Sequence, residues 1–313
     1  MSQARIPCAW LLIFTAAFSN SKRRTKRLTM DPQAALKALW KEARADRLLA
    51  GFMLVIYDLH KALGQAEADL AHLLYRHFQT WARSAARQAA EAYVKVRKGL
   101  DDADGDIDDV EAILAAVSIT GWASIWKDLA PLLETISQKA AEKGFIQVGV
   151  SPDDEMTGAT GNEAAAWARD RACELVGKVW RNGELVDNPK AELNILETTR
   201  EKLRGTIADA LQGGWDKEKL FDALQNNYAF SRSRSELIAR TETANANYQG
   251  NRLAWKQSGV VERQKWITGS GNVCDDCQGM NGDEIGIDED WPDGFPMHPN
   301  CNCTVVPLVE GQE

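Results

Sequence analysis

The sequence predicts a mainly α-helical protein: a body of long helices followed by a small C-terminal α+β module that a cluster of cysteine and histidine side chains braces. Up to Gly259, apolar residues recur at three- and four-residue spacings, as one-sided helices require. Beyond Gly259 the pattern changes to short runs of β-type composition at 264–268, 284–288 and 304–308, with turn-forming residues between them.

The composition limits the classes of protein that the chain can represent. With 313 residues, 44% of them apolar, and 11 tryptophans, the chain can bury a sizeable core. The net charge of −8 argues against a surface built as a whole for nucleic acid, so such a contact would need a local basic patch. Six cysteines in a chain of this length do not indicate a secreted disulfide scaffold.

Residues 1–29 form an uncertain leader or basic arm. The apolar run at 6–18 is short for a bilayer span, and its basic residues, Lys22 to Arg27, follow it, whereas export signals carry theirs in front. No stable membrane association is therefore expected. The alternatives are an extension before a true start at Met30, a signal anchor, or a basic arm that makes weak contact with DNA or touches a partner. Cys8 lies in this segment and is assigned no role.

The N-terminal helical region is expected over 30–150. Its clearest helix carries an apolar stripe, with Gly64 separating it from an earlier helix. The stripe consists of Leu70, Leu74, Phe78, Trp81 and Ala85. The acidic run at 101–109 lacks the glycine and glutamate positions of a calcium loop, so it is interpreted as a connection with a negatively charged helix start.

A linker is predicted at 151–162, because this stretch has turn-forming composition and no periodicity. A second helical region follows over 163–230, with Asn162 as its N-cap, and the C-terminal domain occupies 231–313. Ser233 and Glu236 have the spacing of a capping box at the start of the last long helix.

The cluster near the C-terminus is the predicted functional site. Its members are Cys274, Cys277, His298, Cys301 and Cys303. Four of these five donors can surround a tetrahedral cation, so a structural zinc ion is expected. Disulfides or free thiols and a catalytic metal remain alternatives. Zinc deaminases need a glutamate two residues after the histidine ligand, where this chain has Asn300, and no catalytic residue is assigned.

Three stretches together carry a resemblance to a known family. They are 237–242 (Leu-Ile-Ala-Arg-Thr-Glu), 265–268 (Lys-Trp-Ile-Thr) and 298–303 (His-Pro-Asn-Cys-Asn-Cys). In this order and spacing they resemble the C-terminal domain of the phage head morphogenesis family, the Mu F-like minor head proteins, over roughly 203–308. The family usually has a basic residue between the last two cysteines, whereas this chain has Asn302.

The resemblance implies a minor structural protein of a phage or prophage head, associated with the portal vertex and needed for head morphogenesis. It implies the portal and other head proteins as partners, and a location in the host cytoplasm during assembly and then in the virion head. Neither an enzymatic activity nor a small-molecule substrate is expected. The alternative is a metal-dependent hydrolase or toxin-like enzyme in which Arg240 and Glu242 flank the metal. We instead expect Arg240 and Glu242 to lock the helix onto the strand layer, and Trp266 to be a core residue.

Overall fold

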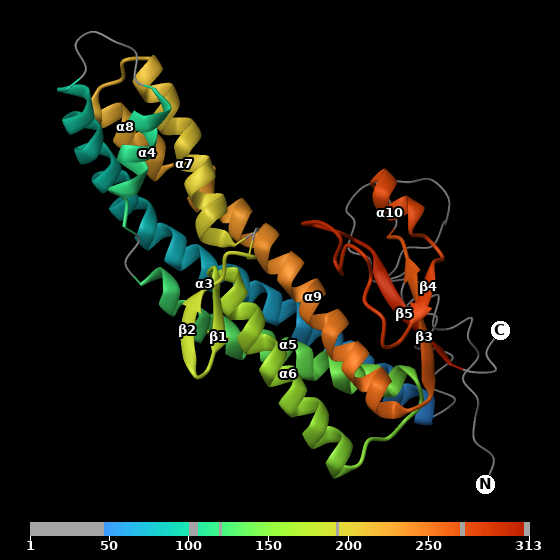
Figure 1. Ribbon diagram of the computed structural model, residues 1–313. Helices are drawn as coiled ribbons and strands as arrows, with labels where there is room; N and C mark the ends of the chain where they lie inside the picture. The colour runs from blue at the N-terminus through green and yellow to red at the C-terminus, as the bar shows by residue number, and fades with distance from the viewer. Residues whose placement is uncertain (1–46, 100–105, 119–120, 192–193, 270–272, 310–313) are drawn as a thin grey trace. The chain divides into compact units, whose positions relative to one another are not determined.

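The computed structural model describes residues 47–99, 106–118, 121–191, 194–269 and 273–309, with side chains from Lys61 onward except Ala123. The leader at 1–29, including Cys8 and the basic arm, lies outside these residues. The described chain is mostly helical and ends in a small sheet, so the predicted fold class is confirmed (Figure 1). No helix within the described ranges is long and apolar enough to cross a membrane.

The chain divides into two compact units whose segments alternate along the sequence. One unit comprises Met1–Ala66, Thr135–Ala164 and Thr241–Glu313, and the other Glu67–Glu134 and Ala165–Arg240. The C-terminal module and the cysteine-histidine cluster belong to the first unit. The predicted division at 150, 162 and 230 stays a prediction.

Helix α3 (Arg47–Arg97) is the longest of the described helices. The predicted stripe is buried along it: Leu70, Leu74, Phe78, Trp81 and Ala85 are all at most 4% exposed. The expected break at Gly64 is absent, because the helix runs through this residue. One glycine costs a helix only about 1 kcal/mol relative to alanine, less than the burial of a single leucine stabilises it.

The second unit also contains short helices that complete its core. They are α4 (Ile107–Ala115), η1 (Trp122–Ser124), α7 (Ile195–Gln212), α8 (Lys217–Gln225) and η2 (Tyr228–Phe230). The Asp106 carboxylate accepts the N–H of Asp109, and the Asp109 carboxylate accepts the N–H of Asp106. The described end of the acidic run is therefore a capping box at the start of α4. The Tyr93 hydroxyl lies 3.0 Å from the carbonyl oxygen of Ala210 and 2.8 Å from that of Trp215, tying α3 to α7 and the turn after it.

The predicted linker is largely helical. After α5 (Trp126–Gln147), helix α6 (Asp154–Leu175) begins eight residues before the expected cap Asn162. Asp153 is the cap, since its carboxylate accepts the N–H of Met156 at 2.8 Å. The glycines and threonines of this stretch have poor helix propensity, but Thr160 and Ala164 are buried, and this packing outweighs propensity.

A β-hairpin that the sequence analysis missed follows α6. Strands β1 (Lys178–Arg181) and β2 (Glu184–Asp187) pair antiparallel across Asn182 and Gly183. Both turn residues have positive φ, 53° and 84°, as a type I′ turn requires. Asn-Gly is the strongest short hairpin signal, but the four-residue strands beside it are too short to show a clear alternation.

Helix α9 (Arg232–Ser258) leads into the C-terminal module. Its cap is Ser231, whose hydroxyl accepts the N–H of Arg234 at 3.1 Å, and not the predicted Ser233. The Arg234 guanidinium is buried and donates to Thr199 Oγ1 at 2.8 Å, Thr198 Oγ1 at 2.7 Å and the Ile195 carbonyl oxygen at 3.1 Å. Burial lowers its pKa to about 10, and these acceptors offset part of that desolvation.

The module contains a three-stranded antiparallel sheet of order β4-β3-β5. The strands are β3 (Val261–Ile267), β4 (Glu284–Gly286) and β5 (Thr304–Val309), close to the three predicted runs. A bulge between Val261 and Arg263 lets Val261 face the core together with Gln264 and Trp266. Pro307 lies on the edge strand β5, where its missing N–H is tolerated.

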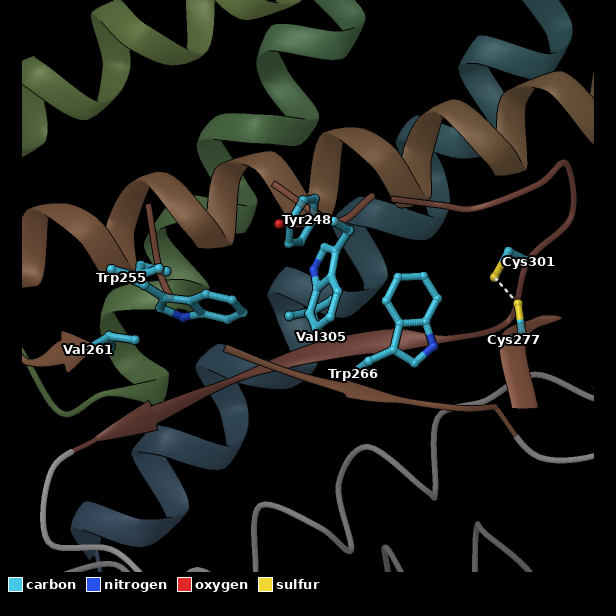
Figure 2. Close-up of a cluster of buried hydrophobic side chains, with 9 residues drawn as sticks. Tyr248, Trp255, Val261, Trp266, Cys277, Cys301 and Val305 are labelled. Atoms are coloured by element: carbon cyan, nitrogen blue, oxygen red, sulfur yellow. Dashed lines mark hydrogen bonds between the residues drawn. The ribbon is translucent and has the colours of Figure 1, made fainter. Parts of the chain in front are cut away.

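Aromatic side chains of α9 and the sheet form the core of the module (Figure 2). Tyr248 and Trp255 are seven residues apart, so both lie on one face of α9. Trp255 and Trp266 are wholly buried, as predicted for Trp266. The Tyr248 hydroxyl lies 2.9 Å from Gln264 Oε1, which satisfies two buried polar groups at once.

Within the same unit, α9 also packs very closely on α5. A Cβ at Gly250 would lie 2.8 Å from Ala140 Cβ and from the carbonyl carbon of Ser137. The carbonyl oxygen of Ser137 would lie closer still. Only glycine at this position allows the two backbones to approach so closely.

Candidate metal centre

The first pair of donors lies on the short helix α10 (Asp275–Gly279). Cys274 is its N-cap and accepts the N–H of Cys277 on Sγ at 3.4 Å. This local bond brings the two sulfurs to the same side of the helix start. Cys274 is exposed, whereas Cys277 is only 1% exposed and belongs to the aromatic core of the module.

The second pair lies at the two ends of a tight turn. The N–H of Cys301 donates to the His298 carbonyl oxygen at 3.2 Å, closing a β-turn with Pro299 and Asn300 at its centre. Asn300 has φ of 62°, and proline followed by a residue with positive φ is typical of a type II turn. His298 and Cys301 are thus held side by side by the residues between them.

The ring of His298 has a defined tautomer. Its Nδ1 lies 2.9 Å from the carbonyl oxygen of Pro299, an acceptor only, so Nδ1 carries the proton. Nε2 then presents its lone pair to the sulfurs. A backbone acceptor on the far nitrogen is the usual support of a metal-bound histidine.

The two pairs converge on one point. His298 Nε2 lies 3.3 Å from Cys274 Sγ and 3.2 Å from Cys277 Sγ. Cys277 Sγ lies 3.7 Å from Cys301 Sγ, the contact that Figure 2 shows. In a tetrahedral zinc site, two sulfurs are separated by about 3.8 Å and a sulfur and a nitrogen by about 3.5 Å. The donor atoms of Cys277, Cys301 and Cys303 likewise lie within 4.8 Å of one another. The residues therefore fit a soft divalent cation.

Without a cation, the surroundings of the buried cysteines favour the neutral thiol. Burial, with the thiols of Cys274, Cys303 and Cys301 close by, raises the pKa of Cys277 far above its usual range. Burial also raises the pKa of Cys301. A bound cation reverses this preference, because a coordinated thiol is deprotonated. All the cysteines that the structure describes are free thiols, including the buried Cys173 of α6.

The three other predicted residues lie in different surroundings. Trp266 is enclosed by the rings of Trp291 and Phe295, at centroid distances of 5.3 and 5.1 Å, and is a core residue as expected. Arg240 Nε lies 3.7 Å from Glu67 Oε1 of α3, so the contact seen for Arg240 is with a helix. Glu242 is buried, at 4% exposure.

Two residues that the sequence analysis missed hold the loops around the cluster. Thr241 Oγ1 accepts the N–H of Asn300 at 3.1 Å. Arg252 donates to the carbonyl oxygens of Ile287 at 3.1 Å and Glu289 at 2.7 Å. In the sequence, the Pro299-Asn300 pair indicates a turn, but it does not indicate which side chain holds that turn in place.

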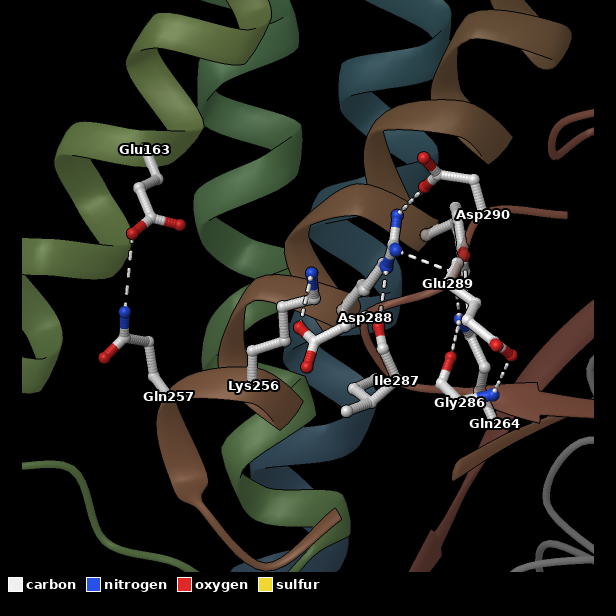
Figure 3. A network of polar contacts seen from close by, with 11 residues as sticks. Glu163, Lys256, Gln257, Gln264, Gly286, Ile287, Asp288, Glu289 and Asp290 are labelled. Carbon is white, nitrogen blue, oxygen red and sulfur yellow. Dashed lines mark hydrogen bonds and ion pairs between the residues drawn. The ribbon is translucent and has the colours of Figure 1, made fainter. Parts of the chain in front are cut away.

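Ion pairs and amide hydrogen bonds from α9 and β3 hold the loop at 286–290 (Figure 3). Gln264 Nε2 donates to the carbonyl oxygens of Gly286 at 3.3 Å and Glu289 at 3.1 Å. Lys256 pairs with Asp288 at 3.1 Å, and Arg252 also pairs with Asp290. These contacts hold the backbone directly before Trp291, in the segment that continues to His298.

Comparison with known proteins agrees with the three motifs. The model of the family described as Phage Mu protein F like protein matches residues 201–306. The comparisons with curated proteins and with solved structures found no match. The matched region contains all five donors of the cluster, together with Thr241 and Arg252. Residues 201–306 are therefore similar to the Mu F-like family, the resemblance that the motifs indicated.

Proposed function

We propose that the protein is a non-enzymatic structural component of a phage or prophage head that is needed for head morphogenesis. The observation that carries the proposal is the family match over 201–306, which covers β3, β4, the start of β5 and every donor of the cluster. The portal and other head proteins are the proposed partners, and the virion head the proposed location after assembly in the host cytoplasm. Arg240 and Glu242 take no catalytic part in this proposal.

The module is proposed to hold a structural zinc ion through Cys274, Cys277 and His298, with Cys301 or Cys303 as the fourth ligand. The sheet has only three short strands, the shortest of them Glu284–Gly286, and so small a sheet depends on packing or cross-links beyond its own strand pairing. A structural zinc would supply folding free energy to such a module. The ligands of the ion would come from the start of α10 and from the turn before β5, so the ion would connect the loop between β3 and β4 with the loop between β4 and β5.

Metal content tests the zinc proposal. Freshly purified, reduced protein is expected to carry about one zinc per chain. Cys277→Ser should lose the zinc and expose the region after Gly259 to proteases, while the helical part stays resistant. Cys173→Ala is the matched control, since Cys173 is also a buried free thiol but lies in α6. Equal zinc content and protease resistance in both variants would contradict the proposal.

Particle assembly tests the head function. The full-length protein is expected to co-sediment with procapsids and to be retained by immobilised portal protein. Particles made without it should show defective heads, and Cys277→Ser should reproduce part of this defect. Normal assembly in its absence, together with no portal binding, would end the proposal. Removing residues 1–29 separately tests the weak DNA contact, which should fall steeply as salt rises.

A further inference from the structure

The turn that carries two of the proposed ligands is anchored at its centre. Asn300 stands between His298 and Cys301, and its N–H donates to Thr241 Oγ1 at 3.1 Å. The two residues are 59 positions apart in the sequence, and Thr241 lies on α9. The anchor therefore joins the ligand turn to the long helix of the same unit.

The geometry of the turn makes this N–H available. In a type II turn, the bond from residue i+3 to residue i closes the turn, and the N–H at i+2 points outward. Here the closing bond is Cys301 N–H to His298 O, and Asn300 at i+2 has the required positive φ of 62°. The hydroxyl of Thr241 supplies the acceptor that this outward N–H needs.

We infer that Thr241 is a positioning residue for the metal centre: it anchors Asn300 to α9 and thereby limits the movement of the adjacent ligands His298 and Cys301. The inference rests on the proposed zinc site. Ligand positions must hold within about 0.2 Å for a stable site, and supports outside the ligands determine whether they do. The same residue gives the Arg-Thr-Glu stretch of the helix a role that does not require chemistry at Arg240 or Glu242.

Three variants of the full-length protein isolate the hydroxyl. Thr241→Val keeps the shape of the side chain and removes the acceptor, whereas Thr241→Ser keeps the acceptor. Thr243→Val is the matched control, because the buried Thr243 hydroxyl has no hydrogen-bond partner among the described residues. The readouts are the rate at which zinc passes to a competing chelator and the hydrogen exchange rate of the Asn300 amide.

Thr241→Val is expected to release zinc about three- to tenfold faster than the wild type, the effect of one lost hydrogen bond. The Asn300 amide should exchange faster by a similar factor. Thr241→Ser and Thr243→Val should both behave like the wild type. If the wild type holds zinc and Thr241→Val releases it no faster than Thr241→Ser, the positioning role is wrong while the zinc site stands. If the wild type holds no zinc, the proposed site fails and this inference fails with it.

Discussion

Replacing Gly269 by alanine is expected to disrupt the metal centre without touching a ligand. Gly269 follows β3, and a Cβ placed on it would lie 2.8 Å from the carbonyl carbon and from Cβ of Asn302. Asn302 stands between Cys301 and Cys303. Carbon atoms in contact prefer about 3.5–4.0 Å, so the Asn302 backbone must move by roughly 1 Å.

A shift of that size exceeds the tolerance of zinc–ligand distances, about 0.2 Å, several-fold. We therefore expect Gly269→Ala to weaken zinc binding by at least about tenfold. The measurement is zinc content after equilibration with a chelator of known affinity, followed by protease resistance of the module.

Gly279→Ala provides the control for this prediction. Gly279 is the last residue of α10 in the same module, and a Cβ there meets nothing within 4 Å. This variant should hold zinc as the wild type does. If Gly269→Ala keeps zinc equally well, the reasoning that ties the cluster to the Asn302 backbone is refuted.

Further predictions concern the packing that supports the site. Gly250→Ala should destabilise the protein by about 1–3 kcal/mol, because the new methyl group meets the α5 backbone. Gly205→Ala, on the exposed face of α7, should instead stabilise it by up to about 1 kcal/mol. Thermal unfolding of both variants is the measurement, and stabilisation by both would be inconsistent with the close contact between α9 and α5. Arg252→Lys should lower the free energy of unfolding by about 1–3 kcal/mol and expose the 286–290 loop to proteases, since lysine cannot donate to both carbonyl groups. An unchanged cleavage pattern would mean that Arg252 does not hold this loop. Arg234→Met should cost about 3 kcal/mol in denaturant unfolding by leaving its buried acceptors unpaired; a loss below about 1 kcal/mol would mean that these bonds do not form in solution.

Strong local patterns made parts of the fold predictable. The stripe from Leu70 to Ala85 and the three strand runs were found from periodicity and composition, and the structure has them at nearly the same positions. The start of α6 was not found, because its glycines and threonines are helical only through packing on buried neighbours. The hairpin at 178–187 was missed because strands of four residues are too short to show an alternation.

The sequence by itself determined the identity of the donors and their two close spacings, Cys274 with Cys277 and His298 with Cys301. Donors three positions apart can be brought together by a single local turn, so the spacing alone indicated each pair. Only the tertiary structure decided that the two pairs meet and that Thr241 and Arg252 hold their loops. The partners of these two side chains are backbone N–H and carbonyl groups, which nearly every residue has, so no pattern of side chains could have revealed them.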